Sequence, residues 1–423
     1  GVIYNQGSYS YVNGSYQQIG GIFGNLNNVK IFNNNSTRET VGAAIYNAGT
    51  IGNWNGGCLY GFGKKDSGIA NNGKFGNISD VEFYNLHSTN AGGIWNNGGV
   101  IGDLSNVKFW NVSAKESGGT IWNNATIGNL TNNVIFQNSS SEDSGGAIFN
   151  LSKIGNINAS FINNSASVNG GAIWNNNTIG DINNSYFNGN HVISTDKDAT
   201  GGAIYNLKNT FNINNSIFRS NYVKSTNKDA YGGAIVYFDN SNPKDINADF
   251  VSNYAQADNG NAKGGAIVNF NKLGTISSSS STYYNNSAKS VSGDAFGGFL
   301  YNTGTIDNIK NVTFLNNSVE SKSGKAQGGA IYNVGDIVQL ENDSFIGNIA
   351  KSSTGIAQGG AIYTLKDMNI VAKDGYTSLF SGNSVTSNSK KEQNAIYVDK
   401  SNLTLTAKNN GKFVFNDTID GQN

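Results

Sequence analysis

The sequence predicts an all-β protein, folded as a single right-handed parallel β-helix (a solenoid) of about fourteen coils with three short strands per coil. Three observations lead to this prediction. The phrase Gly-Gly-Ala-Ile-aromatic-Asn recurs along nearly all of the 423 residues. Each repeat holds three short apolar runs separated by Gly, Asn and Ser, which is typical of strands. No segment has the i, i+3, i+4, i+7 apolar spacing of an amphipathic helix.

The isoleucine of the phrase is the first apolar anchor of each repeat. Between Ile69 and Ile173 its successive spacings are 25, 27, 27 and 25 residues, too short for a four-stranded propeller blade. Equivalent residues of neighbouring coils should therefore stack about 4.8 Å apart, and the crossover preference of parallel strands predicts the right-handed sense. The anchor positions are Ile3, Ile45, Ile69, Ile94, Ile121, Ile148, Ile173, Ile204, Ile235, Ile267, Leu300, Ile331, Ile362 and Ile396.

A second phrase, Phe-x-x-Asn, predicts two structural ladders, because stacked rings and stacked amides can interact along the helix axis. We expect the asparagines also to adopt the left-handed conformation of a corner. The phenylalanine ladder comprises Phe161, Phe187, Phe218, Phe250, Phe314 and Phe345, with Phe32 and Phe413 near its ends. The asparagine ladder comprises Asn164, Asn190, Asn221, Asn253, Asn317 and Asn348, and extends to Asn416.

The coils predict one domain, residues 1–423, with four sections. Residues 1–66 are irregular N-terminal coils, 67–190 are lean coils, 191–390 are coils with a longer corner loop, and 391–423 are C-terminal coils. The added segments after residue 190 are polar and rich in Gly, which predicts surface loops that all leave from one corner.

Composition excludes several classes of protein. The 28 basic and 28 acidic side chains leave no net charge, so the chain has no electrostatic footprint for nucleic acid. The one cysteine, Cys58, excludes a disulfide framework and a multi-thiolate metal site. No run of about 18 apolar residues is present, which predicts no membrane-spanning segment in this chain. Because the chain starts at Gly1 without a leader, we expect a mature or trimmed product.

The alternation of Gly-Gly-Ala-Ile, as at Gly170–Ile173, with Phe-x-x-Asn, as at Phe161–Asn164, resembles the polymorphic outer membrane proteins of chlamydiae and related autotransporter passengers. The resemblance covers about residues 42–421. It implies an extracellular β-helix at the bacterial cell surface that acts in adhesion and is carried by a C-terminal outer-membrane barrel. Barrel-type alternating strands of about ten residues are not seen in this sequence.

The acidic residues and histidines do not form a catalytic pattern. Asp103 and Asp181 occupy the same position of coils three steps apart, about 14 Å, and Asn fills that position between them. His87 and His191 are four coils apart, about 19 Å, and are expected to be solvated turn residues. We therefore predict no catalytic residue, no metal site and no cofactor, and a protein that is not an enzyme; a polysaccharide-active enzyme is the less favoured alternative.

The charged residues of the corner segments are interpreted as surface charges, with a weak Ca²⁺ site as the less favoured alternative. The carboxylates Asp196, Asp198 and Asp229 are expected to be neutralised within their loops by Lys197 and Lys228, next to them in sequence.

An aromatic residue usually follows the anchor isoleucine. Because side chains alternate along a strand, an inward isoleucine directs this residue outward. The predicted strip comprises Trp95, Trp122, Phe149, Trp174 and Tyr205. An outward row of aromatic rings is unusual on a soluble surface. Two interpretations stay open: the rings stack on one another and stiffen the protein, or they form a contact strip for a glycan or a protein.

These observations predict an extracellular or cell-surface adhesin. Its partner would be a glycan or protein on a host or neighbouring cell. The alternative is a structural subunit of an extracellular filament, in which end-to-end self-association covers the open strands of the terminal coils.

Overall fold

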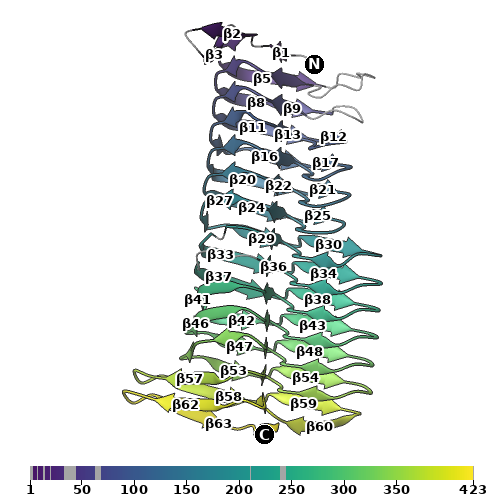
Figure 1. Cartoon of the computed structure of the whole chain (residues 1–423), viewed down its shortest axis with the longest axis vertical. Coiled ribbons are helices and arrows are strands. Elements are labelled where there is room, and N and C mark those ends of the chain that lie inside the picture. Colours follow the sequence, from purple (N-terminus) through teal and green to yellow (C-terminus); the bar gives the residue numbers. More distant parts are fainter. Residues whose placement is uncertain are drawn as a thin grey trace. The chain divides into compact units, whose positions relative to one another are not determined.

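A computed structural model describes residues 3–6, 8–12, 15–19, 21–32, 44–61, 68–209, 211–238 and 244–422. In these ranges the regular secondary structure is β-strand throughout. The chain divides into two compact units, Gly1–Tyr186 and Phe187–Asn423, close to residue 190, where the corner segments begin to lengthen. Each unit is a parallel β-solenoid with stacked coils (Figure 1), so the predicted fold class is confirmed, while the number of coils differs slightly from fourteen.

A complete coil of unit 1 contributes to four sheets rather than three, and in one coil the sheet 3 part is split into two strands, Leu104–Ser105 and Lys108–Trp110. The additional strand follows the core phenylalanine of its coil and contains only two residues, such as Ser165 and Ala166. It lacks the large apolar anchor on which the sequence prediction depended.

The strands of unit 1 are grouped here by sheet. Sheet 1 contains β1 (Ile3–Asn5), β6 (Ile45–Asn47), β9 (Ile69–Asn71), β13 (Ile94–Asn96), β18 (Ile121–Asn123), β22 (Ile148–Asn150) and β26 (Ile173–Asn175). Sheet 2 contains β4 (Ile22–Phe23), β7 (Thr50–Ile51), β10 (Lys74–Phe75), β14 (Val100–Ile101), β19 (Thr126–Ile127), β23 (Lys153–Ile154) and β27 (Thr178–Ile179). Sheet 3 contains β5 (Leu26–Phe32), β8 (Trp54–Tyr60), β11 (Ile78–Tyr84), β15 (Leu104–Ser105), β16 (Lys108–Trp110), β20 (Leu130–Gln137), β24 (Ile157–Ile162) and β28 (Ile182–Asn183). Sheet 4 contains β12 (His87–Ser88), β17 (Ser113–Ala114), β21 (Ser140–Ser141) and β25 (Ser165–Ala166). The separate pair β2 (Ser8–Val12) and β3 (Ser15–Ile19) is antiparallel.

Unit 2 repeats sheets 1, 3 and 4 and adds a fifth; β29 (Tyr186–Asn188) lies at the division. Sheet 1 contains β32 (Ile204–Asn206), β36 (Ile235–Tyr237), β40 (Ile267–Asn269), β45 (Leu300–Asn302), β50 (Ile331–Asn333), β56 (Ile362–Thr364), β61 (Ile396–Asp399) and β64 (Ile419–Gln422). Sheet 3 contains β33 (Ile213–Arg219), β37 (Ile246–Val251), β41 (Lys272–Ser277), β42 (Thr282–Tyr284), β46 (Thr305–Lys310), β47 (Thr313–Leu315), β51 (Asp336–Ile337), β52 (Leu340–Glu341), β53 (Ser344–Ile346), β57 (Met368–Ala372), β58 (Thr377–Ser381), β62 (Leu403–Ala407) and β63 (Lys412–Phe415). Sheet 4 contains β30 (His191–Ser194), β34 (Tyr222–Ser225), β38 (Tyr254–Ala257), β43 (Ser287–Ser290), β48 (Ser318–Ser321), β54 (Ile349–Ser352), β59 (Ser384–Ser387) and β60 (Lys390–Gln393). Sheet 5 contains β31 (Ala199–Thr200), β35 (Ala230–Tyr231), β39 (Ala262–Lys263), β44 (Ala295–Phe296), β49 (Ala326–Gln327) and β55 (Ala357–Gln358).

Sheet 5 corrects the prediction that the added segments are loops. Each of these segments pairs with the next coil, and a serine holds its turn. The Ser290 hydroxyl accepts the N–H of Gly293 at 2.9 Å and donates to the carbonyl of Gly260 at 2.7 Å. The Ser321 hydroxyl makes the equivalent pair of bonds to Gly324 and Gly293. Polar composition indicated loops, but stacking of equivalent segments from neighbouring coils satisfies their backbone groups and makes parts of them strands.

Phenyl rings stack in the core, as predicted. In unit 1 the ring of Phe136 lies 4.9 Å from those of Phe109 and Phe161. Unit 2 continues the pattern in two runs, because Tyr283 and Phe299 interrupt it. The members of these runs are Phe187, Phe218 and Phe250, and then Phe314, Phe345 and Phe380.

The residues predicted for the two ends of the ring ladder, Phe32 and Phe413, are wrong. Phe32 is 58% exposed, and its neighbour Ile31 points inward. At the C-terminal end Phe415, not Phe413, pairs with Phe380. In both strands the register, and not the residue type, decides which side chain enters the core.

The predicted asparagine ladder is confirmed. The Asn221 side chain donates to Asn253 Oδ1 at 3.0 Å and to the carbonyl of Phe187 at 3.0 Å, and its backbone N–H also reaches Asn253 Oδ1. The same bonds run from Asn253 to Asn383, while Asn164 accepts the N–H of Ser139 and donates to the carbonyl of Phe136.

Two details of that ladder differ from the prediction. Asp417, and not the exposed Asn416, accepts from Asn383 at the C-terminal end. The left-handed conformation, with positive φ, is adopted by the residue before the ladder asparagine, such as Asn285 or Asn316, and not by the ladder asparagine itself. The ladder asparagine directs its amide inward.

A second asparagine ladder, which the sequence did not reveal, lies in sheet 1. The buried Asn123 donates to Asn150 Oδ1 at 2.8 Å and accepts from Asn96 at 2.8 Å. In unit 2, Asn269 donates to Asn302 and Asn302 to Asn333. The alternation isoleucine inward, aromatic outward, asparagine inward could have indicated this ladder.

The glycine of each Ile-Gly-Asn phrase is required by close approach of the coils. Asp103 Oδ1 accepts the backbone N–H of Asn129 in the next coil at 2.6 Å. A Cβ on Gly128 would lie 2.3 Å from that oxygen, so only glycine fits there.

Candidate functional site

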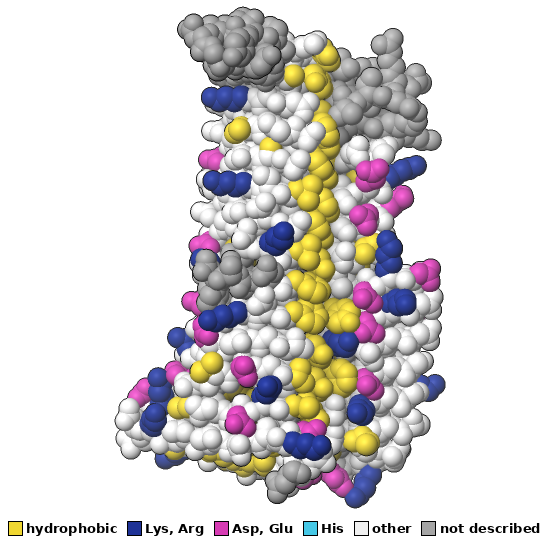
Figure 2. Space-filling model, in the orientation of Figure 1, with side chains coloured by type: hydrophobic (Ala, Val, Ile, Leu, Met, Phe, Trp, Pro, Cys, Tyr) yellow, Lys and Arg dark blue, Asp and Glu magenta, His cyan; other side chains and the backbone are white. Residues whose placement is uncertain are grey.

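The predicted aromatic strip of unit 1 lies on the outer side of sheet 1. Trp95, Trp122, Phe149 and Trp174 are half-buried, and the isoleucine before each one is fully buried. The rings of Trp95 and Trp122 are stacked with centroids 5.6 Å apart, and those of Phe149 and Trp174 are 4.0 Å apart. Figure 2 shows hydrophobic side chains gathered in a column over the sheet 1 strands within each unit.

The stacking decides which parts of these rings a partner could meet. Within each of these two pairs the rings are nearly parallel, at 18° and 6°, so each ring covers one face of its partner and leaves the edges uncovered by it. The indole N–H groups of Trp95, Trp122 and Trp174 have no protein acceptor within the described ranges, whereas the buried Trp54 donates to the carbonyl of Gly56. The strip therefore presents apolar edges together with unpaired donors.

Tyr205, the last residue of the predicted strip, lies in unit 2 in a different environment. Its ring meets Phe238 edge-on at 5.3 Å, and burial raises its pKa to about 12. The equivalent positions of the next two coils are the buried Val236 and Val268. The aromatic column resumes at the stacked Tyr301 and Tyr332.

A lysine and two aromatic rings of sheet 5 cover this part of unit 2. Lys263 Nζ lies 4.6 Å from the centre of the Tyr231 ring and 5.9 Å from that of Tyr301, and Phe296 packs on Tyr332 at 4.5 Å. The strip is thus more open in unit 1, where sheet 5 has no counterpart among the described residues.

The loop carboxylates are paired differently from the prediction. Asp229 Oδ2 lies 2.8 Å from Lys263 Nζ, one coil away, and accepts the Tyr231 hydroxyl at 2.9 Å. Burial alone would raise the pKa of Asp229, but the hydrogen bonds and charge of Lys263, with Asn261 and Tyr231, lower it. Stacking of the coils, which places residues about 32 positions apart side by side, overrides proximity in sequence.

The predicted non-catalytic positions have structural partners. Asp103 holds the backbone of the next coil, and Asn156 Oδ1 likewise accepts the N–H of Asp181. The histidines are in strands rather than turns: His87 contacts Ser113 Oγ at 2.6 Å, and His191 stacks on Tyr222 at 4.7 Å. Burial lowers the pKa of His191. The described part of the chain contains no group of three or more His, Cys, Asp or Glu side chains that could hold a metal ion.

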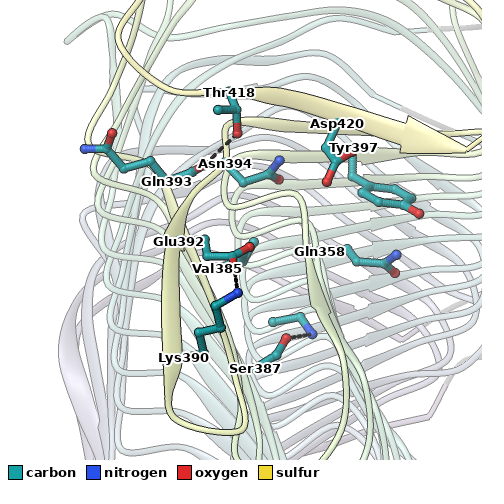
Figure 3. A pocket seen from close by; sticks show the side chains of 11 residues that line it. Gln358, Val385, Ser387, Lys390, Glu392, Gln393, Asn394, Tyr397, Thr418 and Asp420 are labelled. Atoms are coloured by element: carbon teal, nitrogen blue, oxygen red, sulfur yellow. Dashed lines mark hydrogen bonds and ion pairs between the residues drawn. The ribbon is translucent and has the colours of Figure 1, made fainter.

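A small polar pocket of about 140 Å³ lies near the C-terminal end of unit 2. Figure 3 shows Lys390 and Glu392 of β60 directed toward each other, with Tyr397 and Asp420 across the pocket. The ion pair between the first two is 2.5 Å long, and the Thr418 hydroxyl donates to the carbonyl of Gln393 at 2.6 Å. The ion pair and this hydrogen bond connect four of the groups that line the pocket.

Comparison with known families identifies the repeat. Residues 158–176 and 311–334 match the model described as the Chlamydia polymorphic membrane protein (Chlamydia_PMP) repeat. The predicted resemblance is confirmed. Both matched segments of this PMP repeat contain the two phrases that carried the resemblance, Phe161–Asn164 with Gly170–Ile173 and Phe314–Asn317 with Gly328–Ile331. Comparison with curated proteins and with solved structures gives no match. Within the described ranges, no helix is long and apolar enough to span a bilayer.

Proposed function

We propose that this chain is a non-enzymatic, surface-exposed passenger of the autotransporter type, which attaches a bacterial cell to a glycan or protein on another cell. The PMP-type repeats and the β-solenoid support a location at the cell surface. Side-chain oxygens in the polar column that contains Asp103 and Asp181 accept backbone N–H groups of the next coil. This structural role supports a scaffold rather than an enzyme.

One observation carries the adhesive part of the proposal. The outer strip of unit 1 combines the apolar edges of Trp95, Trp122 and Trp174 with three indole N–H groups that have no acceptor in the described part of the protein. Tryptophan with an apolar body and an available donor is enriched where proteins bind partners. Stacking alone would explain the rings but not the row of free donors.

The filament alternative is less well supported. The last strand of sheet 4 in unit 2, β60, pairs with β59 in the antiparallel direction and carries the exposed residues Lys390, Lys391, Glu392 and Gln393. Charged side chains on an edge strand oppose pairing with another chain. Electron microscopy of the purified protein should therefore show separate particles and no fibres.

The adhesive proposal is tested with a double variant, Trp122→Ser with Trp174→Ser. The matched control is Trp110→Ser, because Trp110 is also exposed, at 46%, but lies in sheet 3. Binding of fluorescent protein to cultured cells is measured by flow cytometry, and thermal unfolding by circular dichroism. We expect the double variant to lose at least tenfold in cell binding and the control to retain it.

Unchanged binding by the double variant would refute the role of the strip. A parallel loss of binding and thermal stability would favour the interpretation in which the rings only stack.

A further inference from the structure

A second aromatic column, which the sequence analysis missed, lies on the outer face of sheet 4 in unit 2. The rings of His191 and Tyr222 are 4.7 Å apart at 2°, and those of Tyr222 and Tyr254 are 4.8 Å apart at 1°. All three side chains are half-buried and alternate with inward residues such as Val223 and Ala255. The three rings share one register position of neighbouring strands.

The column stops at Tyr254 and leaves one face of that ring open. The next two coils carry Ser287 and then Ser318 at the same position, and the third carries Ile349, which is 39% exposed. At about 4.8 Å per coil, Tyr254 and Ile349 lie three coils, about 14 Å, apart, and the two serines leave a slot between them. Neither serine hydroxyl has a hydrogen-bond partner within the described part of the chain, so both are available to a ligand.

The surface beside this slot is positively charged. The adjacent outward column runs through Lys224, Gln256, Lys289, Glu320 and Lys351. Gln256, Lys289 and Glu320 of this column line a groove of about 450 Å³, whose lining also includes Val291, Lys322 and Thr354.

The lysines outnumber the acidic groups there. Glu320 lies 2.9 Å from Lys351 and 3.8 Å from Lys289, and Asp258 is near Gln256. Four lysines against two carboxylates give 4 − 2 = +2 in this region of a chain whose formal net charge is zero.

We propose that this surface binds an acidic oligosaccharide, with one sugar ring in the slot against the open face of Tyr254. The C–H face of a pyranose complements the negative face of an aromatic ring, and the slot leaves room for such a ring on Tyr254. The hydroxyls of Ser287 and Ser318 are placed for the polar edge of the sugar. The Lys289 ammonium, whose side chain is 54% exposed, lies one outward position along the same strand and would meet a carboxylate. This site is independent of the tryptophan strip of unit 1.

The test uses a defined probe, a tetrasaccharide of alternating glucuronate and N-acetylglucosamine, with a neutral N-acetylglucosamine tetrasaccharide for comparison. Affinities are measured by isothermal titration calorimetry on the whole chain. The decisive variant is Ser287→Tyr, which continues the ring column and fills the slot without removing a core side chain. Its matched control is Ser287→Ala, which leaves the slot open. Lys289→Gln removes the proposed charge partner.

We expect Ser287→Tyr to lose at least tenfold in affinity for the acidic probe with an unchanged or higher melting temperature. Ser287→Ala, which removes only the hydroxyl that would meet the sugar edge, should lose about threefold in affinity. Lys289→Gln should lose about three- to tenfold, and its affinity should depend less on salt. The double variant Trp122→Ser with Trp174→Ser should bind the probe as wild type does, which separates this site from the tryptophan strip.

Three results would overturn the proposal. The first is no measurable binding of the acidic probe. The second is an affinity of Ser287→Tyr for the acidic probe equal to that of wild type. If Lys289→Gln alone then weakens binding, the probe is held by diffuse electrostatic adsorption and not in the slot. The third is equal affinity for the neutral tetrasaccharide, which would exclude an acidic ligand class.

Discussion

Replacing Asn123 with alanine tests whether the asparagine ladder of sheet 1 holds the coils of unit 1 together. The Asn123 side chain is fully buried and donates to Asn150 Oδ1 at 2.8 Å and to the carbonyls of Ala125 and Lys153, both at 3.1 Å. It accepts from the Asn96 amide at 2.8 Å and from the N–H of Ala125 at 3.3 Å.

The magnitude follows from the groups that the substitution leaves behind. Asn96 still donates to the carbonyl of Thr126, and Asn150 Oδ1 still accepts the N–H of Ser152. Each of these two side chains therefore loses one hydrogen bond and keeps another. The N–H of Ala125 loses its acceptor, and a small cavity forms where the amide was. At about 1–3 kcal/mol for a buried unpaired group, with smaller costs for the weakened bonds and the cavity, we expect a loss of about 3–4 kcal/mol.

The neighbouring asparagine provides the control. Asn124 is exposed and makes one long bond, 3.3 Å, to Asn97, so Asn124→Ala should change the free energy of unfolding by less than about 0.5 kcal/mol. Both variants are measured by urea unfolding, with hydrogen exchange to locate the damage, which should centre on β13, β18 and β22 because coils interact mainly with their neighbours. Equal stability of the two variants would show that the ladder bonds contribute nothing net.

Three further predictions concern stability. Phe136→Ala removes a ring that stacks on Phe109 and Phe161 and should cost about 3–5 kcal/mol in urea unfolding; a cost no greater than that of Trp110→Ala would contradict the role of ring stacking. Asp343 is fully buried, and burial raises its pKa well above the usual value. Because the folded chain therefore holds this proton more tightly than the unfolded chain, the contribution of Asp343 to stability is greatest at acidic pH and is lost as pH rises toward the folded pKa. Asp343→Asn keeps an acceptor for the N–H of Val312 and should gain stability relative to wild type as the pH rises above about 4, the ordinary carboxyl pKa; identical pH profiles would contradict this. Because the described residues contain no cluster of three or more metal-ligating side chains, EDTA should leave the melting temperature unchanged, and a fall of several degrees would reveal a structural cation.

The sequence by itself determined the parts of the fold that depend on repetition. Isoleucine at a constant phase, such as Ile121 and Ile148, required stacked coils, and these two residues pair directly. The same phase placed Trp122 outward, because strand alternation follows from the backbone alone. The repeated Phe-x-x-Asn phrase likewise determined the ladder from Asn221 to Asn383. A stacked amide can donate a hydrogen bond to the equivalent amide of one neighbouring coil and accept one from the other.

Only the tertiary structure decided which residues from different coils meet. The register of the C-terminal strands places Phe415, and not Phe413, in the ring ladder. The asparagine ladder ends at Asp417, and not at Asn416. Stacking of the added corner segments turned apparent loops into sheet 5 and brought Lys263 to Asp229. The open face of Tyr254 exists because the next coil has serine at that position, a relation between residues 33 positions apart in a chain whose coil length varies. Sequence patterns report the direction of a side chain within its strand, whereas its neighbours across the sheet depend on how every intervening corner is folded.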